Sequence, residues 1–491
     1  MKKRVLSIIL ILTLLSAFAS ACGGSESATP TELTETDDNI ETEPEETTPP
    51  EDRPDITEAD YGGAVFNIIY PKWSLYNNFY FAEENNGEAV NDAIFERTQK
   101  IEEAFNISVV PNPVGAADAV YGKVNKTVMA GDSAYQLVLT HCATSLTNYV
   151  KQQIVVNWND MPNIDMSKSY WNRSVSKSMG ISGVLPFNAN AFILPDVNSI
   201  FFNTKLYENY IGDNLYAAVL DGSWTWDMLI QTAEKGSLDI DGDGQFTESD
   251  QYGFVGELDW QFASIPTSCG LYIVSIDQDE GAYISINSEK TVSLIDKFKS
   301  MMYGGNTAFT WTYNQKYDPN VGGTPPVSFN DGKAMYYLVP LSLASAFRSM
   351  DTDFGIVPLP KYDENQDDYI TLNWSGFMCV PMTAGDLEMV GNVVENLGWI
   401  NDEIVVPAFY QILLGQKIAR NDESAKMLDI IFEDSVYDLG VNLGLYNIMT
   451  TCVSSANAKE FASYYEERLN GWNQTVSDYT DACVEYAEER G

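Results

Sequence analysis

The chain has 491 residues, with 28 basic against 70 acidic side chains and a formal net charge of −42 at neutral pH. So large a negative charge argues against nucleic acid as a partner and against direct docking on anionic lipid. Hydrophobic residues make up 45% of the chain. After the N-terminal segment no apolar stretch is long enough for a bilayer, so we expect a globular body large enough for two lobes.

Residues 1–22 have the pattern of an export signal. Three basic residues precede an apolar run at 5–19, and small residues lead to Cys22. The run is shorter than the roughly 20 residues of a membrane span, so cleavage is predicted rather than retention as a helix. A Cys directly after small residues resembles the lipobox of bacterial lipoproteins, in which Cys22 would be acylated. Ordinary cleavage after Ala21 is the alternative.

Residues 23–60 form an acidic segment with 14 acidic side chains and one basic side chain. It is rich in Thr and Pro and has few apolar side chains, so it cannot bury enough surface to offset its chain entropy. We predict a disordered linker. With Cys22, it indicates a domain held by a lipid anchor on the extracellular face of the cell membrane.

Strands and helices alternate in the remainder of the chain. Hydrophobic periodicity and turn residues predict strands at 64–70, 107–110, 135–140 and 199–203, and helices at 89–105, 117–130, 226–234, 291–303, 385–399 and 461–489. Thr225 is the predicted N-cap of the helix at 226–234. The strand–helix–strand order at 64–110 indicates a parallel sheet, and hence an α/β fold.

An Asp-rich loop follows the helix at 226–234. Its ligand positions carry Asp239, Asp241, Asp243, Gln245 (through its carbonyl) and Asp250, and Gly244 stands at the sharp turn. This spacing is that of an EF-hand loop, so we predict a structural Ca²⁺ ion held by these five residues. Asp in place of Glu at the twelfth position shortens the reach, and a solvated Asp-Gly turn is the alternative.

Several segments resemble extracellular solute-binding proteins of ABC importers, and most closely the large carbohydrate-type lipoproteins of Gram-positive bacteria. They are DVNSIFFNTKLY at 196–207, GSWTWDML at 222–229, DQYGF at 250–254, FNDGKAM at 329–335 and FGIVPLPK at 354–361. In that family the Asp-rich loop also stands immediately before the DQYGF segment.

The resemblance implies a two-lobe periplasmic-binding-protein-like α/β fold with hinge strands and a ligand cleft between the lobes. Lobe I is expected at 61–195 with a returning segment at about 335–400. Lobe II is expected at 196–334 with about 401–491. It also implies a monomer that delivers its solute to ABC permease subunits.

Candidate ligand-binding residues follow from the chemistry of sugars, whose C–H faces stack on aromatic rings while polar side chains take the hydroxyls. Four tryptophans stand in loop-like contexts, with core packing as the alternative for each: Trp73, Trp260, Trp311 and Trp374. Asp196 and Asn198 stand at the first crossing between the lobes. Lys72 or Arg348 could instead meet a carboxylate, which keeps uronic acids and peptides among the ligands.

Catalysis has little support in the sequence. The one histidine, His141, follows the strand at 135–140 without a nucleophile motif, and Cys142 beside it would point to the opposite face of an extended strand. We therefore expect His141 to bind ligand or to be structural. An exported glycan-degrading enzyme with paired carboxylates is the rival class. The five other cysteines, Cys142, Cys269, Cys379, Cys452 and Cys483, are expected to be buried free thiols, although up to two disulfides are open.

Overall fold

The computed structural model describes residues 52–73, 79–244, 246–247, 250–258, 260–277, 281–304, 307–311, 327–347, 350–415, 422–433, 435–455 and 458–490. The chain divides into residues 1–53 and residues 54–491. The architecture below is that of the second unit. The export signal, Cys22 and most of the acidic linker lie outside the described residues.

The first sheet has four strands in the order β12-β3-β1-β2. They are β1 (Ala64–Pro71), β2 (Ile107–Val114), β3 (Leu137–Thr140) and β12 (Phe377–Cys379). β1 pairs in parallel with both β2 and β3, and β12 runs antiparallel to β3. The predicted strand–helix–strand unit with a parallel sheet is therefore confirmed, and its second strand is four residues longer than predicted.

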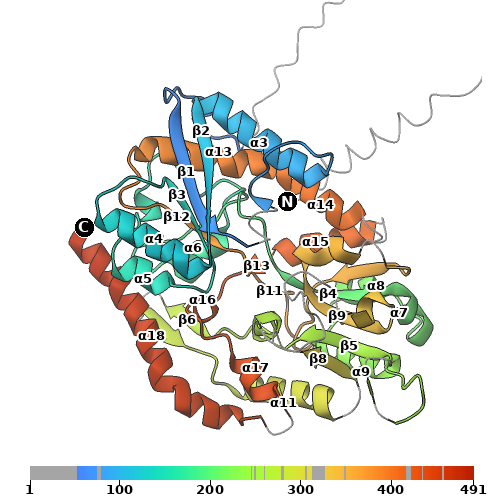
Figure 1. Ribbon diagram of the computed structural model, residues 1–491. Coiled ribbons are helices and arrows are strands. Elements are labelled where there is room, and N and C mark those ends of the chain that lie inside the picture. The colour runs from blue at the N-terminus through green and yellow to red at the C-terminus, as the bar shows by residue number, and fades with distance from the viewer. Residues whose placement is uncertain are drawn as a thin grey trace, which may run out of the picture. The chain divides into compact units, whose positions relative to one another are not determined.

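Helices cover both faces of this sheet. Helix α3 (Ala89–Phe105) connects β1 to β2, and α4 (Ala117–Met129) connects β2 to β3 across the sheet in the opposite direction. Because such crossovers are right-handed, the two helices cover opposite faces. Helix α13 (Leu387–Ile400) packs beside α3 (Figure 1). Apolar side chains recur at helical spacing along α3, and those that face inward, among them Ile94 and Ile101, are fully buried.

The second sheet has five strands in the order β10-β4-β9-β5-β8. They are β4 (Asn198–Asn203), β5 (Tyr252–Glu257), β8 (Ala308–Trp311), β9 (Ala334–Pro340) and β10 (Phe354–Val357). β4 pairs antiparallel with β9 and β10, whereas β5 pairs in parallel with β8 and β9. We call the part built on the first sheet lobe I and the part built on the second sheet lobe II.

Helix α9 (Trp226–Gly236) is the central packing element of lobe II. The Thr225 hydroxyl accepts a 3.2 Å hydrogen bond from Met228 N, which confirms the predicted N-cap. Trp224 and Trp226 are fully buried, and their indole nitrogens donate to Pro358 O and Ser268 Oγ. Each buried indole contributes on the order of 5 kcal/mol of hydrophobic free energy. Both tryptophans therefore pack the core of lobe II.

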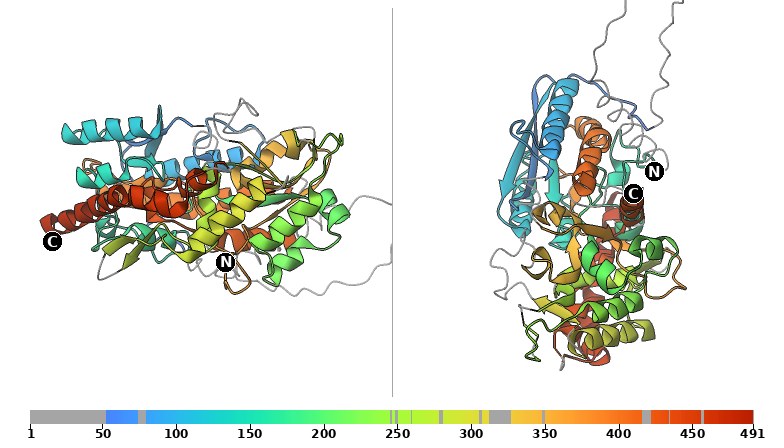
Figure 2. Two further views of the ribbon diagram at one scale, coloured as in Figure 1. Left: turned by 90° about the horizontal axis from the view of Figure 1, so that it is seen from below. Right: turned by 90° about the vertical axis from the view of Figure 1, so that its right-hand side faces the viewer.

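The remaining elements connect the two sheets and surround them (Figures 1 and 2). The helices are α5 (Leu146–Lys151), α6 (Arg173–Met179), α7 (Thr204–Tyr210), α8 (Leu215–Leu220), α10 (Ser264–Ser268), α11 (Glu289–Tyr303), α12 (Val327–Asn330), α14 (Val406–Gly415), α15 (Asp422–Glu433), α16 (Leu439–Asn442), α17 (Ile448–Val453) and α18 (Phe461–Arg490). Short turns are η1 (Trp158–Asp160), η2 (Trp260–Ala263) and η3 (Leu341–Phe347), and η4 (Asn401–Val405) is a π-helix. The remaining strands are β6 (Val274–Asp277), β7 (Gly281–Ile284), β11 (Thr371–Leu372) and β13 (Ser435–Val436).

Three segments cross between the lobes side by side. The first crossing segment is 194–198, which leads into β4. The second crossing segment is β11 together with the residues between β11 and β12. Val197 pairs with Asn373, and Leu341 N donates to Val197 O. β13 pairs in parallel with β11 and adds the third segment. In Figure 1 β11 and β13 lie between the two sheets.

The lobe boundaries differ from the expected ones. Strands β9 and β10 fall in the segment 335–400 expected in lobe I, but both pair with β4 in lobe II. Helix α18, expected in lobe II, packs on α5, and Tyr479 OH donates to Met179 O of α6. The pairing partner of a short apolar strand is set by distant segments, so its own periodicity does not reveal its lobe.

The end of the acidic segment is ordered. The segment was predicted to be disordered to Asp60, but Ala59 N donates to Ala104 O, and Ile56 O accepts from Asn396 Nδ2, so its last residues pack on α3 and α13.

All five cysteines after Cys22 are buried free thiols, as expected. Among the described helices, none combines the length and the apolar character that a bilayer crossing requires.

Candidate ligand-binding site

Asp196 joins the crossing segments. Its backbone N donates a 2.6 Å hydrogen bond to Ser375 Oγ, and its carbonyl accepts a 2.9 Å hydrogen bond from Trp374 N. Ser375 Oγ also donates to Leu194 O at 2.9 Å, so the first two crossings are fastened to each other on both sides of Asp196. The position predicted for Asp196 at the first crossing is therefore confirmed.

The Asp196 carboxylate is half-buried and forms no ion pair with a basic side chain among the described residues. Its Oδ1 accepts a 2.8 Å hydrogen bond from Ser342 Oγ at the start of η3. Burial raises the pKa of Asp196 to about 6, and the Ser342 hydrogen bond opposes that rise. Beyond Ser342, the described residues supply the carboxylate with no other donor. Oδ2 is thus able to accept a hydrogen bond from a ligand hydroxyl.

Three aromatic rings gather on the lobe II side of the crossings. The Trp374 ring lies edge-on to Trp260, with centroids 5.9 Å apart, and edge-on to Tyr446, with centroids 5.4 Å apart. Trp374 is buried, whereas Trp260 and Tyr446 are partly exposed. The structure therefore brings two of the predicted tryptophans together. We call these three residues the aromatic cluster.

Polar side chains lie beneath the aromatic cluster. Asn198 Nδ2 donates to Ser264 Oγ at 2.5 Å, and Trp374 Nε1 donates to the same hydroxyl at 3.4 Å. Asn198 is 1% exposed, and its Oδ1 has no hydrogen-bond partner among the described residues. Asn198 was predicted to contact ligand directly. Its burial instead places it as a support for Ser264 and Trp374.

Trp73 and His141 pair on the lobe I side. Their rings are edge-on with centroids 5.0 Å apart. Trp73, just after β1, is 36% exposed, which is unusual for an indole and leaves it open to contact a ligand. Ala143 N donates to His141 Nδ1 at 3.2 Å, so Nδ1 is unprotonated and Nε2 carries the hydrogen. Burial lowers the pKa of His141 to about 4, so the ring is neutral at neutral pH.

His141 and Cys142 do not form a nucleophilic dyad, although the reason differs from the predicted one. The two residues lie in a turn after β3 rather than in an extended strand, and Nε2 is 4.0 Å from Sγ. Burial lowers the pKa of His141 and raises that of Cys142 well above its ordinary range. Both groups are therefore neutral, which is the opposite of the thiolate–imidazolium pair that catalysis requires.

The segment after β13 links the two sides. Asn442 Nδ2 donates to Cys142 O at 2.9 Å, next to His141. Four residues further on, Tyr446 contacts Trp374. The Asp196 carboxylate also contributes to the raised pKa of Cys142, after burial. Asp196 is thus bonded to Trp374 of the aromatic cluster through its carbonyl, and its charge acts on the residue that follows His141.

Three residues of this arrangement could not be predicted from the sequence, and two predicted residues cannot be placed in it. Ser342 and Ser264 are serines in unremarkable contexts, and Tyr446 is one of 28 tyrosines, so no local signal distinguished them. Of the predicted residues, Trp311 ends β8, but its side chain is not among the described ones, and Arg348 lies outside the described residues. Lys72 is exposed beside Trp73.

The Asp-rich loop brings three carboxylates together. Oxygens of Asp239, Asp241 and Asp243 lie within 4.8 Å of one another. Gly242 and Gly244 have φ of 73° and 80°, and their N–H groups both donate to Asp239 at 2.7 Å, so the loop wraps around that carboxylate. Three hard oxygens at this spacing fit a Ca²⁺ ion.

Asp250 does not join these three carboxylates. Its side chain is fully buried and accepts hydrogen bonds from Ile240 N at 2.9 Å and from Thr247 N at 2.7 Å. These backbone donors lower its pKa, with Thr247 the larger influence. Asp250 therefore closes the loop as a backbone clamp in this structure, rather than serving as the predicted ligand. Gln245, the other predicted ligand, lies outside the described residues.

The chain matches no protein-family model and no curated protein. Three solved structures are similar over 84% of the chain. One is an ABC substrate-binding protein from Listeria monocytogenes in complex with cycloalternan (12% identity, 98% of that chain, TM-score 0.53). Another is the Thermus thermophilus maltotriose-binding protein with maltotriose (13% identity, 99% of that chain, TM-score 0.50). The third is an ABC transporter solute-binding protein from Thermotoga lettingae with α-D-tagatose (10% identity, 100% of that chain, TM-score 0.53).

At these identities the likeness concerns the fold. The two sheets, their crossing segments and the coverage of almost the whole of each similar chain agree with the predicted architecture. The chain thus has the two-lobe α/β fold of the solute-binding proteins of ABC transporters.

Proposed function

We propose that the protein is a non-catalytic receptor that binds an extracellular oligosaccharide between its lobes and delivers it to an ABC permease. All three similar structures hold a sugar, and each is a solute-binding protein. Ligand contacts with both lobes would stabilise the closed state, and the permease would respond to that state.

The observation that carries the proposal is the position of Asp196. One carboxylate oxygen is held by Ser342, while the backbone on either side is bonded to the second crossing at Trp374 and Ser375. Exposed or partly exposed aromatic rings stand on both sides: Trp73 on lobe I, and Trp260 and Tyr446 on lobe II. A charged acceptor between aromatic surfaces is the chemistry that sugar recognition uses.

A thermal-shift screen of mono- and oligosaccharides against peptides tests this proposal. Stabilisation by an intact sugar, with no product after incubation, supports the receptor. Turnover of a glycan would show that the protein is an exported enzyme. Stabilisation by peptides alone would show that the solute is a peptide rather than a sugar. Replacement of Asp196 by Asn should remove most of the stabilisation, because it weakens the central acceptor.

We further propose that the Asp-rich loop binds Ca²⁺ through Asp239, Asp241 and Asp243. The fit of three clustered carboxylates in a loop closed by two left-handed glycines supports the proposal. Bound Ca²⁺ would neutralise their mutual repulsion and rigidify the connection between α9 and β5. Its role is structural, because the loop lies away from the residues grouped around Asp196.

The location follows from the N-terminal sequence. We propose that Cys22 is acylated and that the acidic segment tethers the folded unit to the outer face of the cell membrane. Two acyl chains hold a protein far more firmly than one, at about 0.8 kcal/mol for each buried CH₂. Replacement of Cys22 by Ser should release the protein into the medium, and a variant that stays in the membrane fraction would contradict the anchor.

A further inference from the structure

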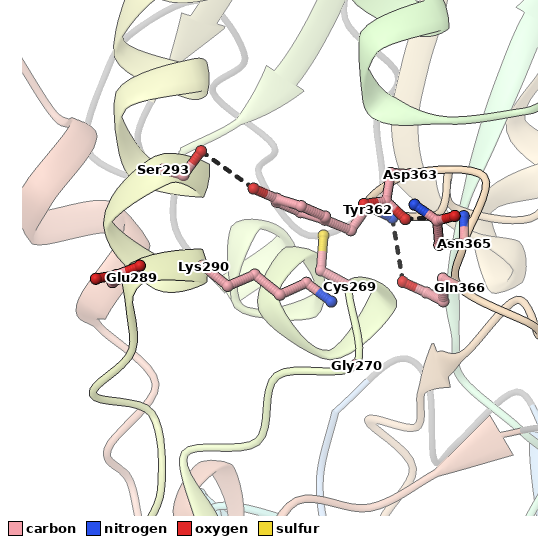
Figure 3. A pocket seen from close by; sticks show the side chains of 9 residues that line it. All are labelled: Cys269, Gly270, Glu289, Lys290, Ser293, Tyr362, Asp363, Asn365 and Gln366. Atoms are coloured by element: carbon pink, nitrogen blue, oxygen red, sulfur yellow. Dashed lines mark hydrogen bonds between the residues drawn. The ribbon is translucent and has the colours of Figure 1, made fainter.

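A hollow of about 590 Å³ lies on lobe II and is lined by none of the residues grouped around Asp196 (Figure 3). It is bounded by the end of α10, the first turns of α11 and the loop that follows β10. The side chains that matter to its chemistry are Lys290, Ser293, Tyr362 and Asn365, with Cys269 at its base. Its volume lies in the range of small-molecule sites.

Lys290 has an unusual electrostatic position in this hollow. Its Nζ lies 4.6 Å from the centroid of the Tyr362 ring. Lys297, two helical turns further along α11, lies 4.9 Å from the same ring and forms a 2.8 Å ion pair with Asp227. Lys290 has no ion pair or hydrogen bond with any of the described residues. The chain has 70 acidic and 28 basic side chains, yet no carboxylate of the described residues pairs with this cation.

The surroundings of Lys290 favour an anion. Glu289 extends away from the Tyr362 ring, whereas Lys290 extends beneath it (Figure 3). The Asp363 carboxylate already accepts Asn365 N at 2.9 Å. Lys290 also stands in the first turn of α11, a helix of 15 residues, where the helix dipole adds positive potential.

The remaining side chains are arranged for binding rather than chemistry. Tyr362 OH donates to Ser293 Oγ at 3.1 Å, and Tyr362 N donates to Gln366 Oε1 at 3.1 Å, so the ring is fixed over the hollow. Burial raises the pKa of Cys269 to about 12, although the charges of Lys290 and Lys297 lower it. The thiol is therefore not a nucleophile at neutral pH.

We propose that this hollow is a second binding site, for a small organic molecule that carries a carboxylate. Lys290 forms the ion pair with the carboxylate, and the side-chain amide of Asn365 donates to it. The Tyr362 ring supports the Lys290 ammonium from above. The site is independent of the solute site at Asp196, so either can exist without the other.

Calorimetric titration with D-galacturonate and D-galactose tests the proposal, because the two sugars differ in a carboxylate against a hydroxymethyl group. Citrate is a second carboxylate probe. Galacturonate or citrate should bind, and Lys290→Met should weaken that binding about tenfold or more, as the loss of a charge-assisted hydrogen bond does. Lys290→Arg should retain it, and Asp196→Asn should not change it.

Lys297→Met is the matched control. It removes a lysine from the same face of α11, at a similar distance from the Tyr362 ring, but one already paired with Asp227. It should change carboxylate affinity less than twofold, about 0.4 kcal/mol. Equal affinity in wild type and Lys290→Met, equal binding of galactose and galacturonate, or no binding of either carboxylate would overturn the proposal. Circular dichroism of each variant verifies that it is folded.

Discussion

The Ser342 hydroxyl donates a 2.8 Å hydrogen bond to Oδ1 of Asp196, and so ties the end of β9 in lobe II to the first crossing between the lobes. The bond opposes the rise in pKa that burial causes, and it leaves the other carboxylate oxygen available. Asp196 is therefore expected to show two linked properties, a pH response and the ligand binding proposed for it, which can be tested together.

Sugar affinity should depend on pH through Asp196. Its folded pKa of about 6 lies above the ordinary 3.8, so its contribution to folding stability is present below that ordinary value and is lost as pH rises through about 6. The charged form is the better acceptor for a ligand hydroxyl. Affinity should therefore fall as pH is lowered through about 6 in wild type, and Asp196→Asn should abolish this dependence.

Ser342→Ala provides a finer test of the same residue. Without the hydroxyl the pKa of Asp196 should rise further, so the midpoint of the affinity profile should move to higher pH. Asp221→Asn, which changes a carboxylate in an exposed turn of lobe II, is the control. If Asp196→Asn left the dependence of sugar affinity on pH unchanged, Asp196 would not be a ligand-binding residue.

Glu395 should make lobe I less stable at higher pH. Its buried carboxylate accepts from Tyr170 OH and, at 2.9 Å, from Trp171 Nε1, yet burial raises its pKa to about 7. Because the folded pKa exceeds 4.5, the stabilising contribution is complete below that value and is lost as pH rises through about 7. The amount is on the order of 3 kcal/mol.

Glu395→Gln removes this titration and is the test of it. In the variant the amide oxygen can accept from Trp171 Nε1 while the amide nitrogen donates to Tyr170 OH, as the protonated carboxyl group does, so its stability should be close to that of wild type at acidic pH. The variant should become the more stable of the two proteins as pH rises through about 7, and urea melts at several pH values measure the difference in free energy of unfolding. A difference that stays constant across pH would show that Glu395 does not titrate in this range.

Chelation should destabilise the folded unit if the Asp-rich loop binds Ca²⁺. EDTA should lower Tm, and added Ca²⁺ should restore it, because a ligand of the native state alone stabilises it by mass action. The double change Asp241→Asn and Asp243→Asn should abolish the response. Asp367→Asn with Asp368→Asn, an exposed acidic pair elsewhere in lobe II, should leave it intact. An EDTA-insensitive Tm in wild type would contradict a calcium loop.

Gly253→Ala should destabilise lobe II severely. Strand β5 passes so close to α9 that a Cβ on residue 253 would lie 1.9 Å from Ala233 O, and neither backbone can yield without loss of packing. We expect a cost of several kcal/mol or failure to fold. Gly122→Ala on α4 has open space and should stabilise by about 0.5–1 kcal/mol. Equal melting temperatures of the two variants would contradict the close approach of β5 to α9.

Local elements could be predicted because their signals are local. The apolar spacing of α3, the Thr225 cap and the β1–α3–β2 unit depend on neighbouring residues, and the structure agrees with each. The lobe of β9 and β10 depends on pairing with β4, which a chain-order argument cannot supply. The contact of Tyr446 with Trp374 likewise joins distant segments.

The site was predictable in part for the same reason. Asp196 was a candidate because it precedes a buried strand at a segment similar to a known family, and Trp374 because a Trp in a polar loop is conspicuous. Ser342 and Ser264 carry no such signal, since their roles exist only once the crossings meet. Asn198 was placed correctly in the chain, but its 1% exposure makes it a support.

The central claim is that the protein binds a sugar at Asp196 and releases it unchanged. The most direct measurement titrates the best sugar of the screen into wild type and Asp196→Asn, and then analyses the recovered sugar by mass spectrometry. The account predicts saturable binding, a loss of about tenfold or more in affinity for the variant, and recovery of the intact sugar. Cleaved sugar, or equal affinity in the two proteins, would contradict it.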